Sequence, residues 1–166
     1  FHIKFSFQRN KKVGVAIYLD KDENIDEIFS KVGFYPDYIH VDMVDKTMNS
    51  NLQPPELKKF SEIKRKWPNH RIESHIMSVE PLKYVDEFCK YSDVIYFHNE
   101  INEDKNLVKN AIINKGKKPG IVIHISKDYK DIDNIIKNYN EVLLLCIEHP
   151  GTSGQKFLNK TFTILD

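Results

Sequence analysis

The fold of this chain is decided by a short stretch of sequence, Tyr38–Met43, which reads YIHVDM. Apolar and polar residues alternate in it, which is the pattern of a β-strand. Residues two apart on a strand share a face, so His40 and Asp42 are expected to point the same way. A second stretch of this kind, Ile72–Met77, carries His75. Two imidazoles and a carboxylate on neighbouring strands form a set that can bind a divalent metal or transfer a proton.

Histidines recur at the ends of other apolar stretches. Either His40 or His75 alone would be interpreted as a core residue whose ring is satisfied by the backbone. Three more histidines, however, lie at or near the carboxyl end of an apolar run, namely His98, His124 and His149. When helices join parallel strands, the carboxyl ends of those strands lie along one rim of the sheet. The recurrence therefore indicates one shared site.

Working outward, strand and helix patterns alternate along the chain. Strands are expected at 13–19, 38–44, 71–77, 93–98, 120–125 and 141–147. Helices are expected at 24–33, 54–67, 81–89, 107–116 and 132–136. Nearly continuous apolar strands separated by helices are typical of a parallel sheet covered on both faces. The pattern predicts an α/β fold and, by itself, leaves open a doubly wound sheet or part of an eight-stranded barrel.

The composition limits the kind of protein. A chain of 166 residues that is 40% hydrophobic can bury one core, which predicts a single domain. The formal net charge of +1 gives no field for nucleic acid or anionic lipid, so neither is an expected partner. The longest apolar run, Val142–Ile147, is far shorter than the roughly 20 residues that span a bilayer, so no membrane segment is expected.

The two ends of the chain and its cysteines carry three further expectations. Residues 1–12 are expected to be a strand or linker from a preceding region, because Phe1–Phe7 alternates like a strand without the features of a signal peptide. Residues 13–166 are then the βα domain. Two cysteines, Cys89 and Cys146, are too few for a disulfide framework, which favours a reducing compartment and a cytoplasmic location.

Several motifs in the same order carry a family resemblance. They are His40–Lys46 (HVDMVDK), His75–Met77 (HIM) followed by Pro81, His98–Glu100 (HNE) and His149–Phe157 (HPGTSGQKF). In sequence and spacing these motifs resemble the ribulose-phosphate 3-epimerase family. The resemblance extends over nearly the whole chain. It implies a (β/α)8 TIM barrel, of which six βα units are present in this chain.

The resemblance also implies an activity and a metal site. Members of the family invert the carbon next to the carbonyl of a phosphorylated ketose, of the ribulose 5-phosphate and xylulose 5-phosphate type. They remove a proton and return it from the opposite face, through an enediolate that a divalent metal stabilises. The metal is usually zinc, with iron, manganese and cobalt as alternatives. The resemblance assigns His40, Asp42 and His75 as ligands, beside an Asp from a seventh strand, and Asp42 as a catalytic acid/base.

The loop after the last strand is the expected phosphate site. Gly151 and Gly154 let backbone N–H groups approach an anion, and Thr152 and Ser153 are expected to add hydroxyl donors. His149 stands at the start of this loop, where the family usually has Asn. From the methionine layer that surrounds the substrate in the family, Met77 remains. The expected partner is therefore a small-molecule sugar phosphate.

Departures from the family pattern keep other interpretations open. The sequence stops at Asp166, soon after the sixth strand, so further residues or another chain are expected to close the barrel. A homo-oligomer or a fusion to another enzyme domain would supply such closure. Val15 and Lys46 replace a Ser and a Gly of the family pocket. The alternative is a non-catalytic sugar-phosphate-binding barrel domain of a larger multidomain protein. Decarboxylase or aldolase chemistry is less favoured, because the expected Lys and Asp clusters are missing.

Overall fold

The computed structural model describes residues 11–127, 129, 131–152 and 154–162. The strand expected within residues 1–7 and the predicted phosphate-site residue Ser153 lie outside these residues. The sheet has six strands: β1 Gly14–Tyr18, β2 Tyr38–Val44, β3 Arg71–Met77, β4 Val94–His98, β5 Lys118–His124 and β6 Glu141–Leu145. Every neighbouring pair is parallel, so the predicted α/β fold is confirmed.

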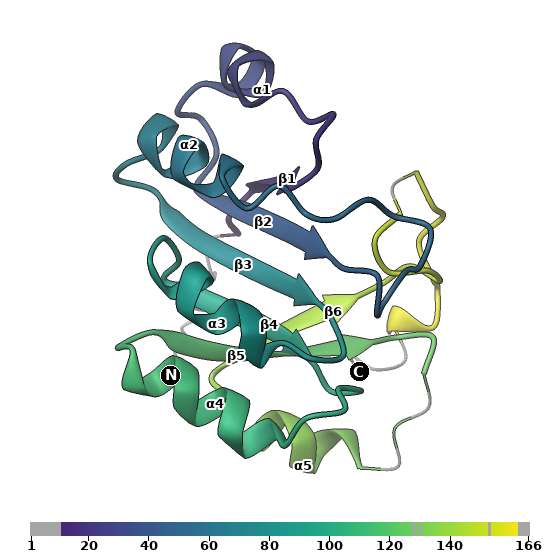
Figure 1. Cartoon of the computed structure of the whole chain (residues 1–166). Helices are drawn as coiled ribbons and strands as arrows, with labels where there is room; N and C mark the ends of the chain where they lie inside the picture. Colours follow the sequence, from purple (N-terminus) through teal and green to yellow (C-terminus); the bar gives the residue numbers. More distant parts are fainter. Residues whose placement is uncertain (1–10, 128, 130, 153, 163–166) are drawn as a thin grey trace, which may run out of the picture.

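The order of the strands in the sheet distinguishes the two architectures that the pattern left open. The order is β1-β2-β3-β4-β5-β6, the same as in the sequence. A doubly wound sheet reverses direction at a switch point, whereas a barrel adds each strand next to the previous one. The sheet is also curled (Figure 1). It is therefore six units of a (β/α)8-type barrel, with β1 and β6 as the edges of the described sheet.

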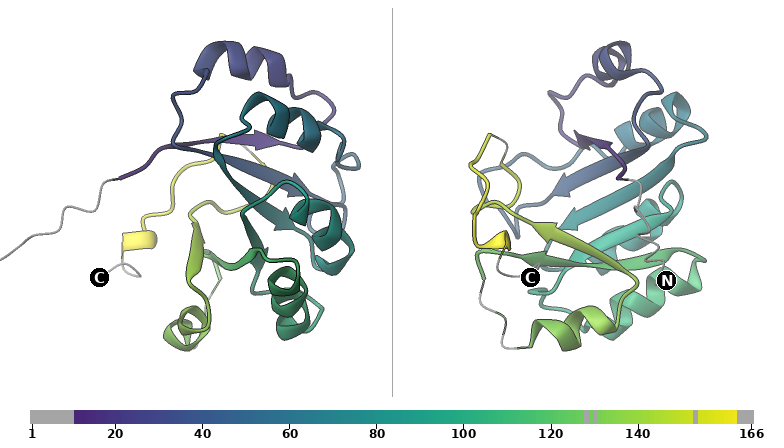
Figure 2. Two further views of the ribbon diagram at one scale, coloured as in Figure 1. Left: turned by 90° about the vertical axis from the view of Figure 1, so that its left-hand side faces the viewer. Right: turned by 180° about the vertical axis from the view of Figure 1, so that it is seen from behind.

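The helices connect successive strands and lie on the outer face of the curl (Figure 2). They are α1 Ile25–Val32, α2 Lys59–Lys66, α3 Leu82–Cys89, α4 Lys105–Asn114 and α5 Ile132–Lys137. Asn24 caps α1 by accepting a hydrogen bond from the Glu27 backbone, and Gly33 ends it as predicted, with a φ of 52° that favours glycine. Among the described residues, none of these helices has the length and apolar character needed to cross a membrane.

Two predicted boundaries were wrong. The second helix begins at Lys59 rather than near Pro54, because the Glu56 N–H bonds to the Leu19 carbonyl and keeps this segment extended along the end of β1. The last strand ends at Leu145, because the carbonyl of the next residue, Cys146, accepts a hydrogen bond from the Leu158 N–H instead of continuing the sheet. Both boundaries are set by hydrogen bonds between residues far apart in the sequence, which local sequence patterns do not reveal.

The two faces of the sheet have different cores. Residues on the outer face of the strands pack with the helices in one large apolar cluster that includes Ile39, Ile72 and the fully buried Trp67. The concave face carries a smaller cluster of Val94, Tyr96 and Val122 with two leucines of β6. Elsewhere the concave face carries polar residues, including His40, Asp42 and His75, beside the apolar Val44 and Met77. The strand period thus buries one side of each strand and leaves the other side for chemistry.

Charged residues line the amino-terminal end of the concave face. The Arg71 guanidinium lies 2.9 Å from a carboxylate oxygen of Glu73 and 3.0 Å from one of Glu141. Arg71 and Glu73 belong to β3, whereas Glu141 begins β6, so this contact crosses the interior of the curl. The pair therefore links two strands that are not neighbours in the sheet, at the end opposite to the predicted metal site.

Candidate metal and active site

The three predicted ligands lie together at the carboxyl end of β2 and β3. Asp42 and His75 are paired directly in the register of these strands, and His40 lies two residues before Asp42 on the same face. Asp42 Oδ1 is 3.0 Å from His75 Nδ1 and 3.4 Å from His40 Nε2. One ligand atom from each residue lies within 4.8 Å of the other two. The side chains thus converge around one carboxylate oxygen, as the sequence predicted.

This donor set fits a divalent transition metal. Two imidazole nitrogens and a carboxylate oxygen are ligands that zinc and iron accept, and catalytic zinc sites use three protein ligands or more with an open position. The side chains of His40 and Asp42 are 14% and 11% exposed, so a narrow opening remains to this otherwise buried cluster. Metal binding at this cluster stays a prediction.

Burial and charge set the protonation of the three groups. Burial alone would raise the pKa of Asp42, but hydrogen bonds from His40 and His75 hold it well below its usual range. Burial would lower the pKa of His40, yet its contacts with Asp42 and Glu73 raise it to about 9. His75 is wholly buried, which lowers its pKa to about 4 despite the neighbouring carboxylate. Asp42 is therefore a carboxylate at neutral pH, flanked by a neutral His75.

A fourth histidine, His98, belongs to the cluster; the sequence placed it at the same rim of the sheet but did not assign it as a site residue. His98 ends β4, is 1% exposed, and places its Nε2 2.8 Å from Nε2 of His75. A carboxylate oxygen of Glu100 lies 3.6 Å from His98 Nδ1. The alternation of side chains along β4 explains this position. Tyr96 pairs with His75, and His98 lies two residues beyond Tyr96, so the side chains of His98 and His75 lie on the same face of the sheet.

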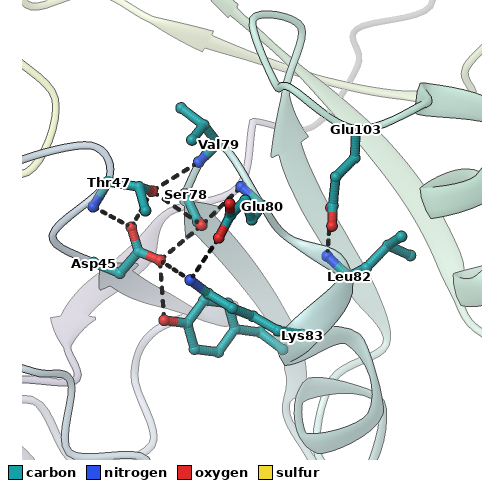
Figure 3. A network of polar contacts seen from close by, with 9 residues as sticks. Asp45, Thr47, Ser78, Val79, Glu80, Leu82, Lys83 and Glu103 are labelled. Carbon is teal, nitrogen blue, oxygen red and sulfur yellow. Dashed lines mark hydrogen bonds and ion pairs between the residues drawn. The ribbon is translucent and has the colours of Figure 1, made fainter.

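Asp45 fixes the loops that follow β2 and β3. It accepts hydrogen bonds from the Thr47 N–H and hydroxyl, from Ser78 Oγ at 2.7 Å and from the Tyr84 hydroxyl at 3.0 Å, and Lys83 Nζ lies 3.0 Å away (Figure 3). These donors outweigh the effect of burial and lower the pKa of Asp45 to about 2. Asp45 is a structural anchor that joins the segments just beyond Asp42 and His75.

The predicted phosphate loop packs against the end of β2. Gly151 has a φ of 78°, and a Cβ placed on it would come within 2.8 Å of both Cγ atoms of Val44. Gln155 organises the loop, because its amide donates to the carbonyls of His149 and Thr152 and accepts from the His149 N–H. The Thr152 hydroxyl donates to the His149 carbonyl, so this donor is used inside the loop.

The remaining predicted substrate residues surround the same region. Met77 is 2% exposed and follows His75 on the concave face of β3. Gly154 has a φ of 74°, and nothing lies within 4 Å of the position that a Cβ would take. Asp42 and Gly151 line one small cavity of about 40 Å³, which adjoins the predicted metal site. A larger cavity of about 310 Å³ begins at Gly151 and is lined by Tyr18 and three acidic residues, Asp20, Asp22 and Glu23.

Comparisons with known proteins agree with this geometry. The profile of the Ribulose-phosphate 3 epimerase family matches residues 15–165. The chain is 30% identical over 125 residues to a ribulose-phosphate 3-epimerase of Synechocystis sp. (strain ATCC 27184 / PCC 6803 / Kazusa), covering 74% of this chain and 53% of that protein. It is 29% identical over 126 residues to the enzyme of the same name from Aquifex aeolicus (strain VF5), covering 75% and 55%. The chain spans about half the length of these curated relatives.

Fold and site together define a βα-barrel protein with a His-Asp-His cluster at the carboxyl end of its strands. Within that class, the chain belongs to the ribulose-phosphate 3-epimerase family.

Proposed function

We propose that this chain is an epimerase-like enzyme that inverts the carbon next to the carbonyl of a phosphorylated ketose, of the ribulose 5-phosphate and xylulose 5-phosphate type. The observation that carries the proposal is the convergence of His40, Asp42 and His75 on one point at the strand ends. Names of relatives and the family match support the same reaction. Residues 13–166 would form the epimerase-like barrel domain.

A divalent ion, with zinc as the first choice, would be held by His40, Asp42 and His75. When bound, it would stabilise the negative charge that develops on the ketose oxygens as the proton leaves. The chain itself supplies the proton acceptor. Asp42 is ionised at neutral pH, and its second carboxylate oxygen is available to take a proton from one face of the substrate. We expect the acid/base of the opposite face to be an Asp of a seventh strand.

The phosphate of the substrate would bind at the loop that contains Gly151 and Gly154. Support comes from the position of this loop, because Gly151 contacts Val44, two residues beyond Asp42. The acidic cavity beside Gly151 would repel a phosphate dianion. The anion is therefore expected on the side of the loop that faces the sheet interior, with Met77 and His149 contacting the sugar.

Metal analysis and solvent exchange test the proposal. Protein purified without chelator is expected to contain about one zinc or iron per chain. In heavy water it should exchange one carbon-bound proton of ribulose 5-phosphate for deuterium. A chain that is thermally stabilised by the ketose phosphate but incorporates no deuterium would instead be the non-catalytic sugar-phosphate-binding domain. Deuterium exchange can be measured even if complete epimerisation needs the second acid/base on the opposite face of the substrate.

Asp42→Asn tests the proposed role of Asp42, which is both a metal ligand and the proton acceptor in this proposal. The variant is expected to lose roughly 100-fold to 10,000-fold in exchange rate, because the amide cannot accept the proton. Asp20→Asn is the matched control: it removes a carboxylate from the cavity next to Gly151, outside the ligand set, and should exchange at a nearly unchanged rate. Equal rates for Asp42→Asn and the unaltered chain would refute the proposed role.

A further inference from the structure

We propose that His98 is a positioning residue for the metal site: it accepts a hydrogen bond from Nε2–H of His75 and thereby directs the bare Nδ1 of His75 at the metal. This inference rests on the proposed function, because it assigns a partner to one of the proposed ligands. Neither the motif resemblance nor the relatives assign a role to this residue.

The geometry of the two rings indicates one shared proton. The Nε2 atoms of His75 and His98 lie 2.8 Å apart, a distance at which one nitrogen must donate and the other accept. The ring planes are nearly parallel, with an interplanar angle of 19°, and the ring centroids lie 4.9 Å apart. Because the two Nε2 atoms are only 2.8 Å apart, a centroid separation of 4.9 Å requires both nitrogens to lie close to the line that joins the two ring centres. An N–H in the plane of one ring thus points along the lone pair of the other.

Metal ligation decides which nitrogen donates. His75 Nδ1 faces Asp42 Oδ1 and the proposed ion, and a ligand nitrogen carries no proton. A neutral imidazole keeps one proton, which must then be on Nε2. His75 is 1% exposed, so water cannot accept this hydrogen bond, and a buried donor without a partner is costly. Among the described residues, His98 Nε2 is the acceptor within hydrogen-bond distance.

The groups on the Nδ1 side of His98 favour a bare Nε2, which can accept the hydrogen bond from His75. With Nε2 bare, the proton of His98 lies on Nδ1, which faces Glu100 Oε2 at 3.6 Å. That carboxylate oxygen is buried and has no hydrogen-bond partner, so it favours a proton directed at it. The other oxygen of Glu100 accepts from the Tyr129 hydroxyl at 2.5 Å, which accepts in turn from the His124 N–H. A series of polar contacts therefore connects β5, through Tyr129, Glu100 and His98, to the proposed metal ligand His75.

Two polar substitutions of His98 test the proposal. In His98→Gln the side-chain amide reaches the position of Nε2 and can accept from His75, whereas in His98→Asn it reaches only the position of Nδ1. We expect the Gln variant to keep the zinc dissociation constant within about threefold. The Asn variant should weaken zinc binding roughly 10-fold to 100-fold, as is usual when the partner of a ligand histidine is lost. The measurement is competition for Zn²⁺ with a chromophoric chelator.

His124 provides the matched control. It is 4% exposed, ends the neighbouring strand β5, and does not contact His75 in the structure. His124→Asn should therefore bind zinc like the unaltered chain, although its stability falls. Equal zinc affinities for the Asn and Gln variants of His98, or an equal loss in His124→Asn, would overturn the positioning role.

Nitrogen NMR of the unaltered chain gives a second, independent readout. With zinc bound, the His75 ring should show a protonated Nε2 and a coupling across the hydrogen bond to His98 Nε2. A protonated His75 Nδ1 in the zinc form, or no coupling, would overturn the proposal. If the chain binds no zinc, the proposed metal site fails instead, and a coupling between the two Nε2 atoms in the metal-free chain would still establish their hydrogen bond without a positioning role.

Discussion

Gly151 connects the predicted phosphate loop to the strand that carries Asp42. Its backbone lies in the left-handed region, with φ at 78°, and Val44 occupies the space where a side chain would begin. Gly154 has nearly the same φ, 74°, but nothing lies within 4 Å of the position of its Cβ. A side chain at Gly154 would therefore meet backbone strain alone, whereas a side chain at Gly151 would meet both backbone strain and a steric clash with Val44.

Alanine at these two glycines is expected to destabilise the chain to different extents. Gly154→Ala should cost about 1 kcal/mol in the free energy of unfolding, from backbone strain alone. Gly151→Ala should cost roughly 2 to 4 kcal/mol, because overpacking against Val44 adds to the strain. Urea unfolding measures both values. Adding Val44→Ala to Gly151→Ala should recover part of the loss; no recovery would mean that Val44 is not the obstacle.

At the scale of elements, Asp45 joins the loop after β2 to the loop after β3 and to the start of α3. A carboxylate that is 4% exposed and accepts several hydrogen bonds is costly to alter, since its donors are left without a partner. Local sequence signals do not indicate this anchor, because Ser78 and Tyr84 are far from Asp45 in the sequence.

Asp45→Asn is expected to lower the free energy of unfolding by about 2 to 4 kcal/mol near neutral pH. Asp26→Asn, which breaks an exposed pair with Lys66, should lower the free energy of unfolding far less. Chemical unfolding of both variants beside the unaltered chain gives the comparison. Similar losses in the two variants would argue against Asp45 as an anchor.

The same anchor predicts an acid-dependent stability. The pKa of Asp45 is about 2 in the folded chain, below its ordinary value of 3.8. A lowered carboxylate pKa stabilises the folded state above the unfolded pKa, and this contribution disappears as the pH falls through the folded pKa. The stability difference between the unaltered chain and Asp45→Asn should therefore shrink from about pH 5 downward. A difference that is constant down to the lowest pH at which both chains fold would contradict this assignment.

At the scale of the whole molecule, the curl of the sheet gathers the strand ends. The apolar outer face packs on the helices, and the concave face holds the histidine cluster at one end and the Arg71 contacts at the other. A metal that binds only the folded arrangement must stabilise the entire domain, because the ligands come from two strands.

Zinc at about one hundred times its dissociation constant should add about 2.7 kcal/mol to the stability of the chain. For a domain of this size that corresponds to a rise of roughly 5 to 10 °C in Tm, measured by calorimetry. Mg²⁺, which prefers oxygen ligands, should give little change. The rise should be lost in His40→Gln and reversed by chelator. An equal rise in His40→Gln would place zinc elsewhere on the chain.

Local signals were enough for much of this protein. Strand period placed His40 and Asp42 on one face, and the alternation of strands and helices predicted a parallel α/β fold. These features were predictable because side-chain period, caps and turn residues depend on neighbours along the chain. The barrel, by contrast, was implied only by the resemblance of the motifs to a known family, and the strand order distinguished it from a doubly wound sheet.

Only the tertiary structure decided the contacts between distant segments. The partnership of His98 with His75, the anchor at Asp45 and the packing of Gly151 on Val44 all depend on strand register and on the curl of the sheet. Register and curl arise from hydrogen bonds and packing between residues far apart in sequence, which no local period encodes. The sequence by itself thus determined the fold class and which face His40 and Asp42 share, while the folded chain determined which distant side chains lie against them.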